Sequence, residues 1–167
     1  MVNICPRIMG RPQPVVERIA TVWCFRFDHY LGIPYSHDMC PCIECFPDEQ
    51  TCYDPCRPEM VGCPLFKDTT IVEQPTSLTS LTYKYTEAGK QFMEKSVLED
   101  KAPFFLNVAY HQTHHPQFAN SSAKHNPRGH FGAALSEMDE SVGQLLSKIE
   151  QLGIRNNTMV IFTSDNG

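Results

Sequence analysis

The pattern of apolar and polar residues is clearest in the last third of the chain. Nearly continuous apolar runs cover residues 104–110 and 158–163, as expected for strands buried on both faces of a parallel sheet. Between these runs apolar residues recur at spacings of three and four, which predicts a helix with one apolar stripe. The stripe consists of Leu135, Met138, Val142, Leu145, Leu146, Ile149 and Leu152. Gly153 stands where a helix commonly ends. The pattern therefore predicts a strand–helix–strand unit.

A second helical pattern precedes this unit. Thr76 and Ser77 open it, and apolar residues follow at spacings of three and four; they are Leu78, Leu81, Tyr85, Ala88 and Phe92. Helices that alternate with strands indicate an α/β domain. We expect a central, mostly parallel sheet flanked by helices, with a right-handed crossover.

Both predicted strands end in polar residues that suit chemistry. His114 follows the first strand, and Asp165 and Asn166 follow the second. Because ligands bind at the carboxyl ends of strands in open α/β sheets, we expect these side chains to face one site. Asp and Asn oxygens suit calcium or magnesium, and a histidine suits an anionic oxygen or a leaving group. The alternative for residues 165–167 is a plain turn, since Asn-Gly is a favoured turn pair.

The loop between the first strand and the helix carries further charge. Lys124 and Arg128 lie in it and would line the same edge of the sheet. Either could hold an anionic group. Ordinary solvated loop charges are an equally good interpretation of both residues.

Another polar run, Ser36-His37-Asp38, lies in an aromatic-rich segment. It has the residue types of a hydrolase triad, but triad members are brought together by the fold and are not normally consecutive. Polar contacts from a loop to a ligand or to the backbone are therefore the favoured interpretation of Ser36.

Cysteines are unusually dense in one part of the chain. The chain has 8 cysteines in 167 residues, and several crowd between Cys40 and Cys56. Cys42, Cys45, Cys52 and Cys56 have spacings close to those of zinc ligands. The same four residues could instead form two nested disulfides that staple a loop without a core of its own. Spacing alone leaves both interpretations open.

Composition limits the compartment and the partners. Potential N-glycosylation sequons begin at Asn120 and Asn156, and together with the cysteines they favour an oxidising, secretory history. The first residues lack the apolar stretch of a signal peptide, which predicts an incomplete chain. No apolar run approaches the roughly 18 residues of a membrane span. A net charge of −5 without a basic stripe argues against a nucleic-acid partner.

Several blocks of sequence together resemble the sulfatase family, and within it the arylsulfatase A-like subfamily. These blocks occur in the family's order, from about Phe25 to the end of the chain. They are residues 31–38, the cysteine cluster, residues 103–106, residues 111–118 and residues 161–167.

The resemblance implies an alkaline-phosphatase-like α/β fold and hydrolysis of sulfate esters through a formylglycine made from a cysteine. The substrate would be a sulfated small molecule, lipid or glycan. Asp165 and Asn166 match ligands of the family's calcium ion. His114 matches the histidine that contacts the sulfate and can protonate the departing alcohol, and Ser36 matches a serine of the sulfate pocket.

The resemblance also bears on the cysteines and on the compartment. Cys42–Cys56 and Cys45–Cys52 match nested disulfides of the subfamily, which favours staples over zinc. It further implies a lysosomal or secreted glycoprotein, and a homo-oligomer for the full-length enzyme.

The departures from the family pattern shape the domain prediction. The chain has no Cys-x-Pro-Ser-Arg motif for the nucleophile, no paired N-terminal aspartates and no Lys-Trp-His block. We therefore expect residues 1–24 to be unmatched and residues 25–167 to be the middle part of a sulfatase catalytic domain, with a disulfide-stapled loop at 40–63. Such a piece would be inactive alone. The alternatives are a non-catalytic glycoprotein piece that binds a sulfated ligand or a homologous subunit, and a zinc-binding module.

Overall fold

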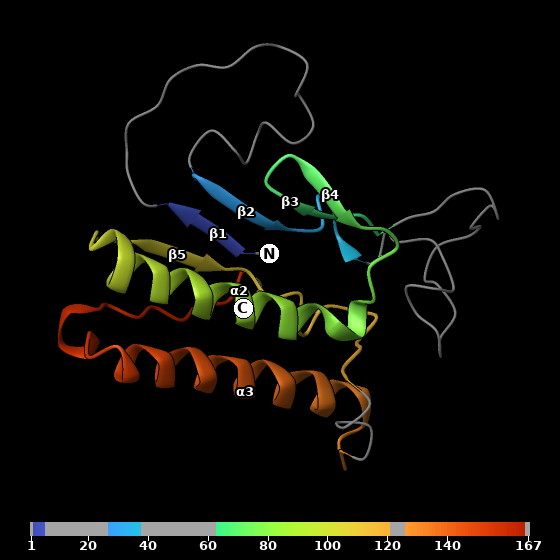
Figure 1. Cartoon of the computed structure of the whole chain (residues 1–167). Coiled ribbons are helices and arrows are strands. Elements are labelled where there is room, and N and C mark those ends of the chain that lie inside the picture. Colours follow the sequence, from blue (N-terminus) through green and yellow to red (C-terminus); the bar gives the residue numbers. More distant parts are fainter. Residues whose placement is uncertain (1, 6–26, 38–62, 121–125, 166–167) are drawn as a thin grey trace.

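The computed structural model describes residues 2–5, 27–37, 63–120 and 126–165, and every structural statement below concerns these residues. Helix α2 packs against the sheet and helix α3 packs against α2 (Figure 1). The strands are β1 (Val2–Cys5), β2 (His29–Gly32), β3 (Leu65–Lys67), β4 (Thr70–Glu73) and β5 (Phe105–Val108). The helices are α2 (Leu81–Lys95) and α3 (Gly129–Gln151), with the short turns η2 (Leu78–Ser80), η3 (Ser96–Asp100) and η5 (Arg155–Asn157).

The described sheet is antiparallel throughout, so the prediction of a mostly parallel sheet is wrong for these strands. Its order is β4-β3-β2-β1-β5, and each neighbouring pair is antiparallel. Two features of the chain account for the antiparallel arrangement. The two residues between β3 and β4 allow only a hairpin, which is antiparallel by necessity. β1 comes from a part of the chain where the sequence indicated no element, and Asn3 pairs with both Tyr30 and Asn107.

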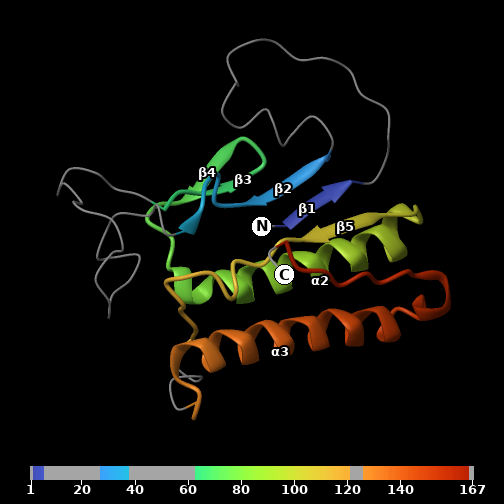
Figure 2. The ribbon, with the colours of Figure 1, turned by 180° about the vertical axis from the view of Figure 1, so that it is seen from behind.

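The second strand of the predicted strand–helix–strand unit is also absent. Residues 158–165, here called the C-terminal segment, form no strand. Its large apolar side chains lie open to solvent, with Met159 85% and Ile161 77% exposed. β1 pairs with one edge of β5, no described strand pairs with its other edge, and the preceding helix α3 packs on α2. The C-terminal segment nevertheless runs in the same direction as β5 in both views (Figures 1 and 2).

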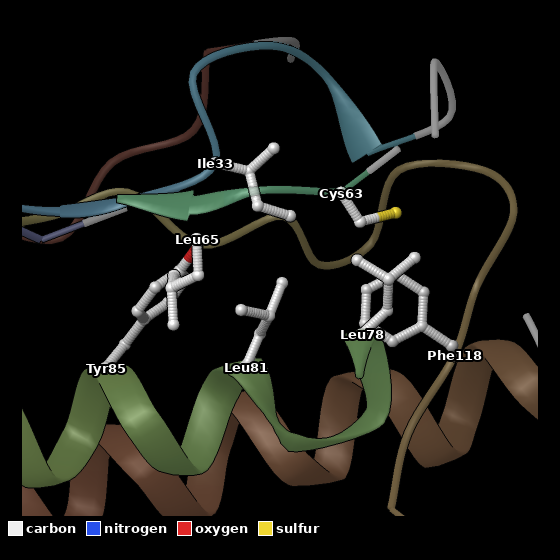
Figure 3. Close-up of a cluster of buried hydrophobic side chains, with 7 residues drawn as sticks. All are labelled: Ile33, Cys63, Leu65, Leu78, Leu81, Tyr85 and Phe118. Atoms are coloured by element: carbon white, nitrogen blue, oxygen red, sulfur yellow. The ribbon is translucent and has the colours of Figure 1, made fainter. Parts of the chain in front are cut away.

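Helix α2 confirms the helical pattern that begins at Thr76 and contributes Leu81 and Tyr85 to the core. Its apolar face turns towards the sheet and meets side chains from β3 and from both flanking loops (Figure 3). The cluster consists of Ile33, Cys63, Leu65, Leu78, Leu81, Tyr85 and Phe118. Burial of a large apolar side chain contributes roughly 1.5–3 kcal/mol, so this cluster contributes to the stability of the described part. Cys63 within it is disulfide-bonded.

Helix α3 confirms the helical pattern at residues 135–152, and part of the predicted stripe is covered, since Ile149 is buried and Leu145 lies against α2. The residues buried against its surroundings are mostly small, including Ala133, Ala134 and Ser141. Small residues let the two helices approach closely, and a Cβ on Gly89 of α2 would lie 3.1 Å from Leu145. Gly153 follows the helix with a φ of +69°, as predicted for a helix C-terminus.

The predicted stripe of α3 is therefore only partly covered. Leu135, Met138 and Val142 line a groove of about 560 Å³ together with Phe162 of the C-terminal segment. Among the described residues, no helix combines the length and the apolar character that a membrane crossing requires.

Candidate functional site

The segment that follows β5, residues 111–118, is here called the histidine loop. At its start His111 stacks on Phe118 at its end, with ring centroids 4.4 Å apart and an angle of 20° between the planes. Phe118 is 7% exposed and belongs to the apolar core. The loop is therefore closed on itself and fixed to the core at one point.

His111 is a buried, neutral member of this arrangement. Its Nε2 is buried and has no hydrogen-bond partner among the described residues. Burial lowers the pKa of His111 well below its ordinary value, and the positive charge of a protonated His37 would lower it further. Its ring also lies 6.3 Å from that of Tyr85 on α2. His111 thus contributes packing rather than charge.

His37 joins a distant part of the chain to the histidine loop. It is 5% exposed, and its Nε2 donates a hydrogen bond to the carbonyl oxygen of Pro116 at 3.2 Å. Its ring centroid lies 5.6 Å from that of His111, 5.2 Å from that of His114 and 5.2 Å from that of Phe118. Residues 79 positions apart are thereby held together.

His114 is the exposed histidine of the cluster. Its Nδ1 lies 2.6 Å from the carbonyl oxygen of His115. Because a carbonyl only accepts, Nδ1 carries a hydrogen and donates it. Nε2 has no hydrogen-bond partner within the described part of the chain. A protonated His114 can therefore donate from Nε2 to an anionic oxygen or to a leaving group.

The back of the histidine loop is tied to both helices through Gln112. Its amide nitrogen donates to Thr82 Oγ1 on α2 at 2.5 Å and to Glu137 Oε1 on α3 at 3.2 Å. The other oxygen of Glu137 accepts from the backbone N–H of Asn120 at 2.6 Å. Glu137 thus contacts the stretch after β5 at two points, Gln112 and Asn120. A single glutamate on a helix gives no signal in the sequence, so the sequence does not predict this role.

A buried hydroxyl network lies between the helices beneath this stretch. Ser141 Oγ on α3 lies 2.5 Å from Thr86 Oγ1 on α2 and 2.7 Å from the hydroxyl of Tyr110. Thr86 in turn donates to the carbonyl oxygen of Thr82. Burial raises the pKa of Tyr110 above its ordinary value, so its hydroxyl stays protonated. The network positions the residue directly before His111.

The predicted metal ligands lie at the end of the C-terminal segment. Asp165 is exposed, and Asn166 lies outside the described residues. The end of this segment and the carboxyl end of β5 lie on the same side of the molecule in both views (Figures 1 and 2). Carboxylate and amide oxygens suit calcium chemically, but calcium takes six to eight oxygen ligands. Within the described ranges no group of three or more His, Cys, Asp or Glu could hold a metal ion, so the residues present do not make a complete site.

The remaining predicted site residues fall into four groups. Ser36 is exposed and directly precedes His37, so it lies on the segment that contacts the histidine loop. Asn120 and Asn156, the predicted glycosylation sites, are both exposed. The third group, Cys42, Cys45, Cys52 and Cys56 with their predicted disulfides, lies outside the described residues, as does Lys124. Arg128 is exposed at the start of α3, away from any described anion site.

Sequence reasoning gave His37 and His111 no role of their own in the site. In the sequence His37 is part of the polar run Ser36-His37-Asp38, and His111 lies within the matched block 111–118. The signal that points to them is the density of histidines in residues 111–115 together with His37 in the aromatic-rich segment. Their mutual packing depends on a contact between distant segments, which no local pattern encodes.

Comparison with known proteins assigns a family to this arrangement. The sulfatase family model matches residues 28–167. Arylsulfatase A of Homo sapiens is 42% identical over 144 residues, which cover 84% of this chain and 28% of that protein. Arylsulfatase G of Homo sapiens is 38% identical over 160 residues, 84% of this chain and 29% of that protein.

A third relative shows how wide the similarity is. N-acetylgalactosamine-6-sulfatase of Mus musculus is 34% identical over 148 residues, 84% of this chain and 26% of that protein. The chain thus spans about 28% of the length of the curated relatives it matches. The match includes β2, α2, the histidine loop and α3, and it shows that this chain belongs to the sulfatase family.

Proposed function

We propose that this chain carries part of the active site of a sulfuric ester hydrolase of arylsulfatase type. The observation that supports it best is the presentation of His114 on an anchored loop, with Nδ1 engaged and Nε2 without a described partner. The relatives named above are sulfatases by name, and the chain matches their family from residue 28 onwards. The substrate would be a sulfated small molecule, lipid or glycan.

The chemistry of a sulfate ester explains the residue types. A sulfate group carries negative charge on its oxygens, which a protonated imidazole stabilises through a charge-assisted hydrogen bond. His114 would bind one sulfate oxygen and, when the S–O bond to the alcohol breaks, would pass its proton to the departing oxygen. The Ser36 hydroxyl, on the neighbouring segment, would donate to a second sulfate oxygen.

Two parts of the reaction lie outside these residues. No sequence resembling the Cys-x-Pro-Ser-Arg motif, which would give a formylglycine nucleophile, occurs in the chain. Calcium, when bound, would act as a Lewis acid that neutralises sulfate charge. Asp165 and Asn166 are the residues we propose as its ligands from this chain, although two ligands alone make a weak site. We therefore propose that this polypeptide binds sulfate but does not hydrolyse its esters by itself.

A sulfate titration tests the binding part of the proposal. Inorganic sulfate would be added to the ¹⁵N-labelled chain at acidic pH while the backbone amide resonances of residues 111–118 and the His114 imidazole resonance are followed. We expect a saturable shift that His114→Ala abolishes and that His29→Ala retains. His29 is the matched control because it is a half-exposed histidine on β2, away from the histidine loop. A shift that survives in His114→Ala would refute the assignment of the anion site.

A second function is favoured by the uncovered C-terminal segment. Four consecutive side chains, Met159, Val160, Ile161 and Phe162, are at least 56% exposed. Apolar extended segments and open sheet edges invite pairing with another chain. The alternative is therefore a non-catalytic piece that binds a sulfated ligand or a homologous subunit. Light scattering distinguishes the two, because a pairing function predicts a defined oligomer that Ile161→Lys dissolves.

The cellular setting is proposed from the resemblance and from the sequons. We propose a lysosomal or secreted glycoprotein with glycans on Asn120 and Asn156 and with disulfides Cys42–Cys56 and Cys45–Cys52. Expression in a secretory pathway followed by enzymatic deglycosylation should lower the apparent mass in two steps. Asn120→Gln and Asn156→Gln should each remove one step. Free-thiol counting with and without reductant would separate disulfides from zinc thiolates.

A further inference from the structure

The rings of His37, His111 and His114 form a cluster, here called the histidine cluster. Within it His37 makes a hydrogen bond in addition to its packing contacts. His37 lies almost fully buried, at 5% exposure, yet it is a polar residue on a short segment after β2. Buried polar groups are kept where they are hydrogen-bonded. The partner found for its Nε2 is the carbonyl oxygen of Pro116, in the middle of the histidine loop.

The hydrogen bond fixes the backbone directly after His114 and His115. A carbonyl oxygen accepts only, so His37 Nε2 carries the hydrogen. The backbone carbonyl of His115, one residue before Pro116, accepts the hydrogen bond of His114 Nδ1 at 2.6 Å. The bond from His37 thus holds the peptide unit next to the one that orients the His114 ring.

The ring of His37 acts on His114 as well. The two ring planes stand at 85° with centroids 5.2 Å apart, an edge-to-face contact. On its other sides His37 meets His111 and Phe118, which are themselves stacked. His37 therefore rests against a rigid pair that is joined to the core, and His114 rests against His37.

We propose that His37 is a positioning residue for His114. Its hydrogen bond to Pro116 and its ring contact together keep Nδ1–H of the His114 imidazole on the carbonyl oxygen of His115, so that the Nε2–H of the protonated ring is turned towards an anionic oxygen. The inference rests on the proposed function for its biological meaning, because an oriented His114 matters only if it meets sulfate. The orientation itself is a property of the chain that can be measured without any ligand.

The first measurement needs no substitution. Imidazole ¹⁵N shifts of the native chain report which nitrogen of His114 carries the hydrogen in the neutral ring. We expect the Nδ1–H tautomer to predominate, although a free histidine favours Nε2–H. We also expect a nuclear Overhauser effect between the rings of His37 and His114. A predominant Nε2–H tautomer, or the absence of this ring-to-ring effect, would overturn the inference.

Substitutions of His37 then separate its two contacts. His37→Phe keeps a ring and removes the hydrogen-bond donor, whereas His37→Gln keeps an amide donor and removes the ring. Each should shift the His114 tautomer part of the way towards Nε2–H, and His37→Ala should shift it furthest. His29→Phe is the matched control and should leave the tautomer unchanged. An unchanged tautomer in the folded His37→Phe and His37→Gln variants would overturn the inference, whatever their stability.

The sulfate titration separates this inference from the proposed function. If His114 binds sulfate, His37→Ala should weaken binding about fivefold, the effect expected from one hydrogen bond of typical net strength. If the native chain shows no shift with sulfate, the proposed function fails while the tautomer measurement still decides the role of His37. If sulfate binds with equal affinity in all three His37 variants, the positioning role fails and the anion site stands.

Discussion

The histidine loop and the C-terminal segment are the two places where the sequence predicted chemistry, and they differ sharply in how the chain supports them. The histidine loop is joined to the core by Phe118, to a distant segment by His37 and to both helices by Gln112. The C-terminal segment is the more apolar of the two in sequence, yet Ile161 is 77% exposed and no described strand pairs with the segment.

The difference shows that apolar composition alone does not bury a segment. Residues 105–108 became a strand because β1 offered them hydrogen-bond partners. Residues 158–163 have the same apolar character, but in the described part of the chain they pair with no strand, although the outer edge of β5 carries no described partner. A strand needs a neighbour as well as a pattern, since its backbone groups must be paired when buried. Within the described residues, the histidine loop is therefore held by contacts with the core, whereas no strand pairs with the C-terminal segment.

The largest expected difference lies between Leu81, in the core cluster that holds Phe118 of the histidine loop, and Ile161 of the C-terminal segment. Leu81→Ala should lower the free energy of unfolding by about 2–5 kcal/mol, because Leu81 is 1% exposed in the core and its loss leaves a cavity. Ile161→Ala should change it by less than about 0.5 kcal/mol. Urea denaturation followed by circular dichroism measures both. Equal losses would mean that the C-terminal segment is buried in solution.

The hydroxyl network behind the histidine loop should give the next largest effect. Ser141→Ala removes the shared partner of Thr86 and Tyr110 between the helices. Leaving buried hydroxyls short of a partner should lower the free energy of unfolding by about 1–3 kcal/mol. Ser147→Ala, at an exposed position of the same helix, is the control and should have no measurable effect. If both variants unfold at the same urea concentration, the network does not stabilise the loop.

Protonation of His111 should make stability depend on pH. The folded-state pKa of His111 lies well below its ordinary value, so the unfolded chain binds the proton first. Stability is therefore lost as the pH falls from about 6.5 towards the folded-state pKa, with a slope of up to about 1.4 kcal/mol per pH unit. His111→Phe should remove this slope, and His29→Phe should retain it. Urea midpoints measured between pH 7 and pH 5 would show this pH dependence of stability. If His111→Phe has the same slope as the native chain, the slope comes from another titratable group.

The smallest effects belong to surface ion pairs. Lys84 reaches Glu73 at 2.6 Å next to the core, with 26% and 38% of the two side chains exposed. Arg155 reaches Glu150 at 3.2 Å beside the C-terminal segment, and both are at least 60% exposed. Lys84→Met should cost at most about 1 kcal/mol and Arg155→Met close to nothing. The difference between them should shrink in high salt, and a larger cost for Arg155→Met would reverse the comparison.

Local patterns predicted the helices well and the sheet poorly. The spacing of Leu78, Leu81 and Tyr85 was enough for α2, and Gly153 marked the end of α3. Helical hydrogen bonds are local, so the sequence within one element decides them. Strand direction depends on which distant segment becomes the neighbour. The position of β1 between β2 and β5 was therefore not predictable from residues 2–5 alone.

The same distinction applies to the candidate site. Matching short blocks to a family selected His114 and Ser36, and the structure describes both as exposed on neighbouring segments. The contacts that orient His114 come from His37, far away in sequence, and from a single backbone carbonyl. Such contacts follow from the folded arrangement of the chain. The roles of Asp165 and Asn166 stay a prediction.

The central claim is that this chain binds sulfate through His114 without completing hydrolysis. The most direct test incubates it with a chromogenic aryl sulfate at acidic pH and follows the His114 imidazole resonance, the backbone amide resonances of residues 111–118 and phenol release together. The account predicts a saturable resonance shift, absent from His114→Ala, and no phenol release. Phenol release that His114→Ala abolishes would contradict it, and so would a substrate that leaves the His114 resonance unmoved.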